Sequence, residues 1–388
     1  MTDNMDILFV QHGDYGEAYK KMITDQKETY RDQFRSVNFV KNLAKTNNVR
    51  VISFCPRPHS EKLEDNLWSI GIEKNNYLAR ILYSKLASFK TDILICRTPH
   101  LPTLRWAAKN NIKTLPCFAD TFTTKGIRSK LNNYTLRRAL EKVHKPCVAN
   151  HSLNASQSLT LLGVNPSDIV PWDWSPLKLI AESKSNVGGN KPFSLMYVGI
   201  LSIAKGVDTI LEALAVLKHR GAEIELNIAG NGNLEFWKDY AKELGIASQV
   251  HFIGTIASDS ILQTMRNNTA VVVPSKHEYP EGLPNTIYEA LASRSPLIIS
   301  DHPAFTGRLK PYRNCLSFEA GNASDLADKL LELKNRPGLY ELISENSADA
   351  LQQLYIGEDW CDLMTNFIND PENQTQWTKE INLQFLVG

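Results

Sequence analysis

The length of 388 residues exceeds what one ordinary core occupies, so it predicts two domains that each bury an interior. The 43% hydrophobic and 22% charged residues are typical of a soluble globular protein, and the apolar runs fall short of the roughly 20 residues of a membrane span. The net charge of +1 conceals an asymmetry, because residues 1–170 hold 25 Lys and Arg against 15 Asp and Glu, whereas residues 171–388 hold 18 against 27. The first half is therefore expected to meet the more anionic partner.

The N-terminus and the cysteines indicate a cytoplasmic protein. The acidic and polar start, Met1-Thr-Asp-Asn-Met-Asp6, does not have the pattern of a signal peptide. The six cysteines form no Cys-x-x-Cys pair, and the first four lie in or beside apolar runs, where a thiol usually acts as a small core residue. We therefore expect a reduced, cytoplasmic setting.

Short apolar runs alternate with helix-period segments along the first half, which predicts β-α-β units and a parallel sheet. The predicted strands are Asp6–Gln11, Val49–Phe54, Asp92–Cys96, Thr114–Ala119, Pro146–Ala149 and Asp168–Pro171. The predicted helices are Arg31–Lys45, Asn75–Ser88 and Ile127–Val143. The stretch Ala18–Tyr30 delays the first clear helix, so it predicts a long loop of the kind that forms lids or contacts acceptors.

The second half repeats this alternation after Trp172–Pro192, whose prolines, serines and glycines without a clear period predict a linker at residues 172–192. The predicted strands that follow are Ser194–Val198, Glu223–Ala229, Val250–Ile253, Ala270–Val273, Pro296–Ser300 and Cys315–Phe318. The expected fold class is thus α/β, with two doubly wound, Rossmann-like parallel-sheet domains at residues 1–171 and 193–355. Residues 356–388 are expected to contribute a helix that packs back on the first domain.

The loop after the first predicted strand is a candidate acceptor site. In an open α/β sheet, ligands bind beyond the carboxyl ends of the strands. This loop reads His12-Gly-Asp-Tyr-Gly-Glu17 and holds Gly13, Asp14 and Gly16. Its two glycines permit close approach to a ligand, but a tight turn explains them equally well.

Two loops of the second half have a composition that favours a nucleotide. Gly199 follows a predicted strand, and Lys205 precedes a predicted helix, where a cation beside backbone amides favours phosphate. The segment Ala229-Gly-Asn-Gly232 follows the next strand. Alone it is a weak signal, but together the two loops would flank a nucleotide.

The stretch Glu278–Ala292 places Glu281 and Glu289 around a predicted helix start. Pro284 suits the first turn of a helix, and Glu289 lies five residues later, about 7–8 Å along the axis at 1.5 Å per residue. A carboxylate pair there usually complements the helix dipole, worth about 0.3–1 kcal/mol, yet Glu289 lies beyond the first turn and gains little. Because carboxylates accept hydrogen bonds from vicinal diols, the pair predicts a ligand with a central phosphate and a diol at each end, as in a nucleotide-sugar.

These segments resemble glycosyltransferase family 4, whose members are retaining enzymes of the GT-B fold with two domains that face a central cleft. The resemblance covers residues 192–335, and it rests on Gly199…Lys205-Gly206, Ala229–Gly232, Phe252–Gly254, Pro274-Ser275 and Glu281–Ala290. It implies an acceptor-binding first domain and a nucleotide-sugar-binding second domain. It also implies a UDP- or GDP-linked donor as substrate, with no cofactor and no metal.

The resemblance assigns roles to single residues. Glu281 would hold hydroxyls of the donor sugar, Glu289 would bind the ribose hydroxyls, and Lys205 would neutralise the diphosphate. The other implied donor contacts are Gly199, Asn231, Gly232, Ile256, Gly282, Leu283 and Asn285.

Two positions depart from the family pattern. The family usually has Arg directly after the glycine that corresponds to Gly199, where this chain has Ile200, and the lost cation would cost on the order of a few kcal/mol of transition-state stabilisation. Many relatives place a His where this chain has Asp120, which would either contact the sugar or acceptor or cap a turn. His100 and His151 also lie at strand ends as acceptor-side candidates, although a structural role is the simpler interpretation of both.

The segment Lys125–Lys145 carries seven Lys and Arg against one acidic residue, Glu141. A rough helical stripe of apolar residues runs through it: Ile127, Leu131, Tyr134 and Val143. One interpretation is an amphipathic helix with a solvated basic face. The other is contact with an anionic lipid surface or a polyprenyl-diphosphate acceptor.

The predicted function is retaining transfer of a sugar from a nucleotide-sugar to a hydroxyl of a glycan or polyprenyl-linked glycan, in cell-surface polysaccharide synthesis. We expect a cytoplasmic enzyme, either free or peripheral on the inner face of the plasma membrane, and no nucleic-acid partner. Because of Ile200, a non-catalytic nucleotide-sugar binder or a subunit that supports a partner stays open. A hydrolase or epimerase of the same fold is disfavoured because it lacks the context of Glu281 and Glu289.

Overall fold

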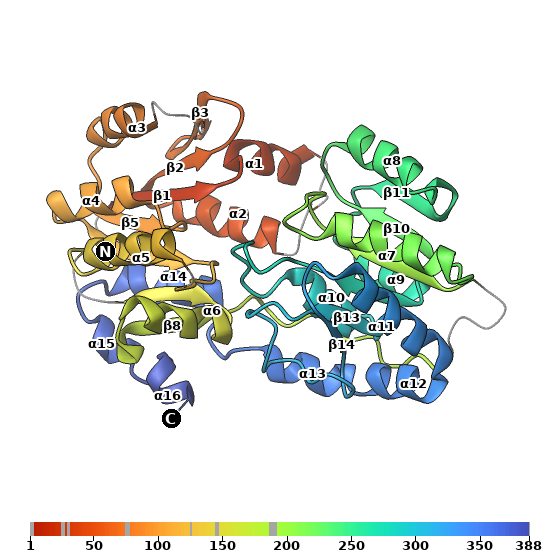
Figure 1. Cartoon of the computed structure of the whole chain (residues 1–388). Coiled ribbons are helices and arrows are strands. Elements are labelled where there is room, and N and C mark those ends of the chain that lie inside the picture. Colours follow the sequence, from red (N-terminus) through yellow and green to blue (C-terminus); the bar gives the residue numbers. More distant parts are fainter. Residues whose placement is uncertain are drawn as a thin grey trace. The chain divides into compact units, whose positions relative to one another are not determined.

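The computed structural model describes residues 4–24, 28, 32–73, 78–124, 126–143, 147–185 and 192–387. Contacts divide the chain into two units (Figure 1). Unit 1 contains the described residues up to Ser175 together with those from Ile356 onward, and unit 2 contains those in Pro176–Tyr355.

Unit 1 is built on an eight-stranded sheet in the order β3-β4-β2-β1-β5-β6-β7-β8. Its strands are β1 Asp6–His12, β2 Asn48–Phe54, β3 His59–Glu64, β4 Leu67–Ile72, β5 Ile93–Cys96, β6 Lys113–Phe118, β7 Val148–His151 and β8 Ile169–Trp172. All neighbouring strands are parallel except β3 and β4. Central strands such as β1 and β5 are buried on both faces, which explains their continuous apolar runs.

The hairpin of β3 and β4 is absent from the sequence-based prediction. β3 reads His-Ser-Glu-Lys-Leu-Glu and forms the edge of the sheet, where one face and one row of backbone groups meet solvent. A strand in that position needs no apolar run, so its sequence does not distinguish it from a loop. β4 pairs with β2 and is mostly buried.

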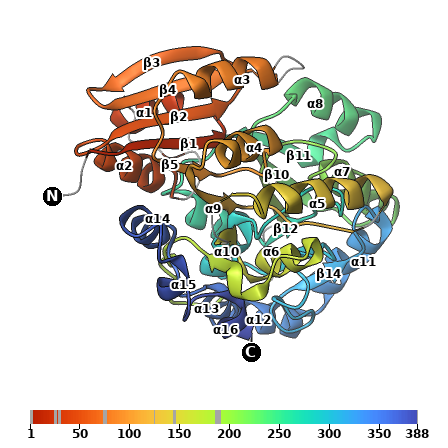
Figure 2. The ribbon, with the colours of Figure 1, turned by 90° about the vertical axis from the view of Figure 1, so that its left-hand side faces the viewer.

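Helices cover both faces of the unit 1 sheet (Figure 2). One face packs against α1 Tyr15–Thr24, α2 Gln33–Leu43 and α14 Trp360–Asn369. The other face packs against α3 Leu78–Ala87, α4 Leu101–Lys109, α5 Ile127–Leu140 and α16 Leu383–Val387. The short helices are α6 Leu153–Ser158 and α15 Gln374–Trp377. Among the described helices, none has both the length and the hydropathy needed to cross a membrane.

The prediction of a long loop at Ala18–Tyr30 is wrong for the residues up to Thr24, because the helix α1 occupies Tyr15–Thr24. Tyr15, Ala18 and Tyr19 share one helix face, and all three are buried against the sheet. The polar residues between them hid this periodicity. Residues 25–27 and 29–31 lie outside the described part of the chain.

The C-terminal segment from Ile356 belongs to the core of unit 1. Trp360 of α14 is fully buried, and its ring lies 5.5 Å from the ring of Trp174. Just before this helix, Asp359 accepts a hydrogen bond of 2.7 Å from Nη2 of Arg35 on α2. The last helices therefore stabilise the first unit, although the last strand of its sheet, β8, already ends at Trp172.

The apolar stripe predicted for the basic helix does not face the core. Ile127, Leu131 and Tyr134 of α5 are exposed, and the buried residues of this helix are Leu136, Ala139 and Leu140. Val143, after the helix, is the one member of the stripe that is buried. The stripe follows the helical period, but contacts of the helix with the rest of the unit decide which face is covered. Lys125 and Lys145 lie outside the described residues.

Unit 2 is built on a six-stranded parallel sheet in the order β11-β10-β9-β12-β13-β14. Its strands are β9 Ser194–Val198, β10 Glu225–Ala229, β11 Val250–Gly254, β12 Ala270–Val273, β13 Leu297–Ser300 and β14 Leu316–Phe318. Its helices are α7 Val207–His219, α8 Leu234–Glu243, α9 Ile261–Asn267, α10 Asn285–Ala292, α11 Ala323–Asn335, α12 Pro337–Glu345 and α13 Ser347–Leu354. This is the doubly wound order, which reverses direction between β9 and β12. The predicted fold class of two Rossmann-like parallel-sheet domains is confirmed.

Part of the predicted linker packs on unit 2. The backbone N–H of Ile180 donates to the carbonyl of Ala292, at 2.9 Å, and the N–H of Lys184 donates to Oγ of Ser344, at 2.7 Å. Residues 186–191 lie outside the described part of the chain.

Candidate functional site

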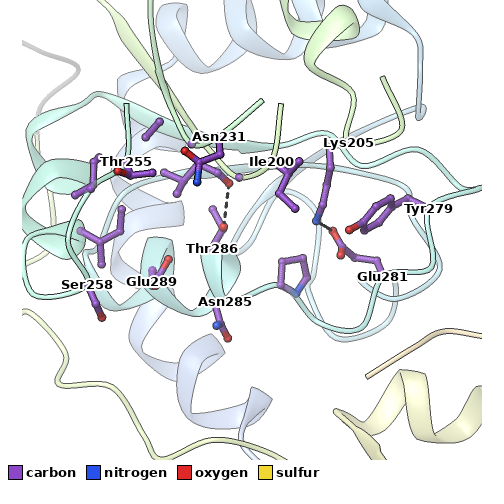
Figure 3. Close-up of a pocket in the computed structure, with 17 residues that line it drawn as sticks. Ile200, Lys205, Asn231, Thr255, Ser258, Tyr279, Glu281, Asn285, Thr286 and Glu289 are labelled. Carbon is purple, nitrogen blue, oxygen red and sulfur yellow. Dashed lines mark hydrogen bonds and ion pairs between the residues drawn. The ribbon is translucent and has the colours of Figure 1, made fainter. Parts of the chain in front are cut away.

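A cavity of about 460 Å³ opens at the carboxyl edge of the unit 2 sheet, beside the point where the strand order reverses (Figure 3). Its lining comes from the loops that follow β9, β10 and β11 and from the segment Tyr279–Glu289, which leads into α10. A cavity of this size, at this place in a doubly wound sheet, is typical of a small-molecule site.

Close backbone contacts shape the floor of this cavity. Gly230 follows β10, and a Cβ on it would lie 1.8 Å from the carbonyl oxygen of Gly199. The N–H of Gly199 donates to the carbonyl of Ala229 at 3.0 Å, and the N–H of Gly230 donates to that of Gly254 at 2.9 Å. The three loops are therefore held together at a distance that only glycine permits.

The loop after β9 is also fixed to its neighbours at its far end. Gly206 has a φ of +74°, and a Cβ there would lie 2.2 Å from the carbonyl oxygen of Pro274. Glycine is thus required directly before α7, where Lys205 enters the cavity. Nζ of Lys276 lies 2.5 Å from Oδ2 of Asp208 and ties the start of α7 to the loop after β12.

Lys205 and Glu281 form an ion pair inside the cavity, and Figure 3 shows their side chains pointing toward each other. Nζ of Lys205 lies 2.5 Å from Oε1 of Glu281, and Oγ of Ser275 donates to the same oxygen at 2.8 Å. The ammonium also lies 4.4 Å from the ring centroid of Tyr279. Little of either charged side chain is exposed, 16% for Lys205 and 8% for Glu281, so the pair is largely shielded from water.

His302 holds the segment that carries Glu281, a role that the sequence-based prediction missed. Its Nδ1 accepts a hydrogen bond from the N–H of Ala304 at 3.1 Å, so the proton resides on Nε2, which donates to the carbonyl of Tyr279 at 3.0 Å. Burial lowers the pKa of His302 and keeps the ring neutral. The available signal was its position just after the predicted strand that ends at Ser300.

Helix α10 begins at the cavity with Asn285 and carries Glu289 one turn later. Glu289 is 6% exposed and lines the cavity from the same side as Asn285 and Thr286. Oγ1 of Thr286 donates to the carbonyl of Val198 at 3.2 Å, which joins the helix start to the end of β9. The positive end of the helix dipole therefore points into the cavity and favours an anion.

The structure brings together most of the donor-side residues named from the sequence. Seven of them line the cavity: Gly199, Lys205, Asn231, Ile256, Glu281, Asn285 and Glu289. Gly232, Gly282 and Leu283 are not among the lining residues. The side chain of Leu283 packs in the core with α10, and Gly232 lies against Leu201. Roles expected for these three depend on backbone groups alone.

Ile200 also lines the cavity, between Asn231 and Lys205 in Figure 3, and is 60% exposed. Its side chain brings no charge to this edge. Among the lining residues, Lys205 is the one cation, against two carboxylates on Glu281 and Glu289.

Asp120 lies in unit 1 after β6, where its backbone is held by Asn150. Nδ2 of Asn150 donates to the carbonyl of Asp120 at 2.9 Å, and Oδ1 accepts from its N–H at 3.2 Å. Burial raises the pKa of the Asp120 carboxyl to about 6. A carboxyl with a raised pKa at the carboxyl edge of a parallel sheet is a candidate functional group.

The other acceptor-side candidates of unit 1 have structural contacts. Oδ1 of Asp14 accepts from the N–H of Glu17 at 2.9 Å at the start of α1, and its Oδ2 lies 3.0 Å from Nη2 of Arg57. The ring of His100 lies 4.7 Å from that of Phe54, and its Nδ1 lies 2.9 Å from Oγ1 of Thr103.

Gly13, Gly16 and His151 complete this set. Gly13 has a φ of +86° and donates its N–H to the carbonyl of Phe54 at 3.3 Å. A Cβ on Gly16 would lie 2.5 Å from Oε1 of Glu61, so α1 approaches the edge hairpin closely. His151 is buried, with Nε2 3.3 Å from Oδ1 of Asp173. These contacts are those expected of a tight turn and of a structural histidine, and the acceptor-side role of all three residues stays a prediction.

Most of unit 2 is similar in sequence to known glycosyltransferases. Residues 180–350 match the sequence family described as Glycosyl transferases group 1. Mannosylfructose-phosphate synthase of Agrobacterium fabrum is 25% identical over 170 residues, which is 42% of this chain and 37% of the relative. The chain spans less than half the length of the curated relatives that it matches first.

Solved structures extend the likeness to both units. HepE of Anabaena, in complex with UDP and glucose, has a TM-score of 0.65 at 14% identity, with 95% of this chain and 100% of that chain covered. The lipopolysaccharide outer core galactosyltransferase WaaB has a TM-score of 0.60 at 19% identity, with 97% and 100% covered. Residues 180–350 are thus similar in sequence to the glycosyltransferase group 1 family, and the chain shares the two-domain fold of these solved structures.

Proposed function

We propose that this chain is a retaining glycosyltransferase that moves a sugar from a UDP- or GDP-linked donor to a hydroxyl of a glycan or polyprenyl-linked glycan. The observation that carries the proposal is the cavity that holds the Lys205–Glu281 ion pair and Glu289 around the start of α10. It combines one cation and a helix N-terminus, which suit a diphosphate, with two carboxylates, which suit diols. The UDP complex of HepE supports a nucleotide-sugar as the ligand class.

In this proposal each charged group of the cavity has one task. Lys205 and the first amides of α10 neutralise the diphosphate, Glu281 accepts hydrogen bonds from hydroxyls of the donor sugar, and Glu289 accepts those of the ribose. Ser275 and His302 position Glu281 without touching the donor. In unit 1, Asp120 is the proposed acceptor-side group.

The proposed step breaks the bond between the anomeric carbon and the β-phosphate oxygen and forms a bond to the acceptor oxygen on the same face. The acceptor proton passes to the departing phosphate oxygen, so no separate base is needed. Positive charge near that oxygen lowers the barrier, and Lys205 supplies it. We propose that the step needs no divalent cation, in which case activity persists in excess chelator.

We propose that the acceptor belongs to cell-surface polysaccharide synthesis and that the reaction takes place in the cytoplasm, at the inner face of the plasma membrane. The lipopolysaccharide core transferase among the structural relatives supports this acceptor class. A panel of lipid-linked glycans, offered with the donor identified by thermal shift, tests it. Transfer only to free monosaccharides would contradict it.

The decisive experiment measures nucleoside diphosphate release from a panel of nucleotide-sugars, with and without acceptor glycans. A transferase releases the diphosphate when the acceptor is present, and the Glu281→Ala variant does not. Acceptor-independent release at the full rate would instead identify a hydrolase.

A non-catalytic nucleotide-sugar binder is the second candidate. Ile200 and the pairing of Lys205 with Glu281 favour it, because together they leave little positive charge for a leaving diphosphate. Donor binding that raises the unfolding temperature, without release under any acceptor, would establish this function. At 100 times its dissociation constant a donor stabilises the fold by ~2.7 kcal/mol.

A further inference from the structure

Helix α5 carries its large apolar side chains on the side that faces solvent. Ile127, Leu131 and Tyr134 are 87%, 62% and 60% exposed. Their spacing of four and three residues places them along one helix face, which we call the outer stripe. Ile127 is the most exposed large hydrophobic residue of the described chain. Figure 2 shows α5 on the side of unit 1 that is turned to the viewer.

The opposite face of the same turns is polar. Ser129, Asn132 and Asn133 line a cavity of about 400 Å³ together with Phe122, and Nδ2 of Asn133 donates to the carbonyl of Thr123 at 2.9 Å. Apolar packing into the core begins only at Leu136. An ordinary surface helix has its apolar stripe toward the core, so the packing of unit 1 does not account for the outer stripe.

Basic residues surround the outer stripe. At about 100° per residue, Arg138 continues the stripe, Arg128 lies on one flank, and Lys130 and Arg137 lie on the other, whereas Lys142 follows the end of the helix. The described residues 126–143 contain these five basic residues and one acidic residue, Glu141, whose Oε1 accepts from Nε of Arg137 at 2.8 Å. The local net charge is therefore +4.

We propose that the outer stripe and its basic flanks dock on an anionic lipid bilayer. The three apolar side chains enter the boundary between headgroups and acyl chains, while the long Lys and Arg side chains reach the lipid phosphates. Tyrosine suits this depth because its ring is apolar and its hydroxyl is polar. The helix lies in the plane of the surface, and each basic residue contributes about 1 kcal/mol, a factor of about five in partitioning.

Repulsion between like charges argues against a second copy of this chain as the partner that binds the outer stripe. A two-fold contact through the outer stripe would place Arg138 and both basic flanks against themselves. Three apolar residues also supply much less than the roughly 800 Å² per partner of a stable protein interface. This docking surface extends the proposed location at the membrane, but it uses no residue of the donor cavity, so the two proposals fail separately.

The test measures co-sedimentation of the full chain with phosphatidylcholine vesicles and with vesicles that also contain phosphatidylglycerol, at low and high salt. We expect binding to the anionic vesicles alone, weakened by salt. The Arg128→Gln/Lys130→Gln variant should bind roughly 25-fold less tightly, from a factor of about five for each charge. The matched control, Lys238→Gln/Lys242→Gln on α8, should bind like the wild type.

A second variant tests the apolar part of the surface. Ile127→Ser/Leu131→Ser should lower partitioning by roughly tenfold or more, whereas Ile23→Ser, on an exposed position of α1, should not. Unfolding temperature and donor-induced thermal shift should stay at wild-type values, because neither residue packs in a core or lines the donor cavity. Equal binding to neutral and anionic vesicles, no binding, or a variant that only loses self-association would overturn the proposal.

Discussion

Lys205 and Glu281 form an ion pair across 76 positions of the sequence, with 2.5 Å between Nζ and Oε1. The loop after β9 supplies the lysine, and the loop before α10 supplies the glutamate. A diphosphate that binds near Lys205 would compete with Glu281 for the positive charge of the lysine. In the proposed function, the pair would therefore link recognition of the sugar to neutralisation of the leaving group.

This link predicts non-additive effects. Lys205→Met and Glu281→Gln should each lower kcat by about 100-fold, the effect of removing one charge-stabilising group. The double variant should lose much less than the product of the two factors, because each single change already breaks the shared contact. Rates of nucleoside diphosphate release in a double-mutant cycle measure this coupling. Independent, multiplicative losses would show that the two residues act separately.

We expect that replacing Ile200 with arginine strengthens the binding of a nucleoside diphosphate. Ile200→Arg places a guanidinium at the edge of the cavity next to Lys205, so affinity for a nucleoside diphosphate should rise by about tenfold, from one charge-assisted contact. The matched control is Ile203→Arg, since Ile203 is exposed in the same loop but is not among the lining residues. Calorimetric titration at two salt concentrations compares the variants. Equal affinities of the Ile200→Arg and Ile203→Arg variants would show that position 200 does not face the diphosphate.

Glu289 predicts discrimination between ribose and deoxyribose. If its carboxylate accepts hydrogen bonds from the ribose, the wild type should prefer a ribonucleotide donor over its 2′-deoxy analogue by about tenfold or more. The Glu289→Ala variant should bind both donors with similar, weakened affinity. Donor dissociation constants for the four combinations decide the matter, and a preference that survives in Glu289→Ala would assign the ribose to another group.

Asp120 predicts a pH-dependent stability. Burial raises its pKa in the folded chain to about 6 from 3.8, so the protonated form is favoured by folding. This contribution is complete below pH 3.8 and is lost as the pH rises to about 6. Asp120→Asn should therefore unfold at a higher temperature than the wild type at pH 7, and the difference should shrink as the pH falls from 6 toward 4.

Thermal unfolding across this pH range, compared with Asp168→Asn, measures the effect. Asp168 has a raised pKa for the same reason, desolvation by burial, and no catalytic or binding role is proposed for it. If the Asp120→Asn variant is more stable but less active than the wild type, the carboxyl group of Asp120 serves the activity and not the stability of the fold. A destabilised Asp120→Asn at pH 7 would contradict the burial argument.

Some strands and helices could be predicted from the sequence, and others could not. The strands of unit 2 lie within two residues of their predicted positions, because central parallel strands are apolar on both faces and therefore stand out. The edge strand β3 and the helix α1 were missed, because one is polar and the other has an interrupted period. His302 was missed as well, since its value lies in a hydrogen bond to Tyr279, 23 positions away.

The sequence by itself determined the class of fold, the central strands of both sheets, and the residue types gathered after the strands of the second half. Those features follow from local periodicity and from the rule that parallel strands end at a common edge. Only the tertiary structure decided that Lys205 pairs with Glu281 and that the apolar stripe of α5 faces outward. Both depend on contacts between segments far apart in the chain, which no local pattern encodes.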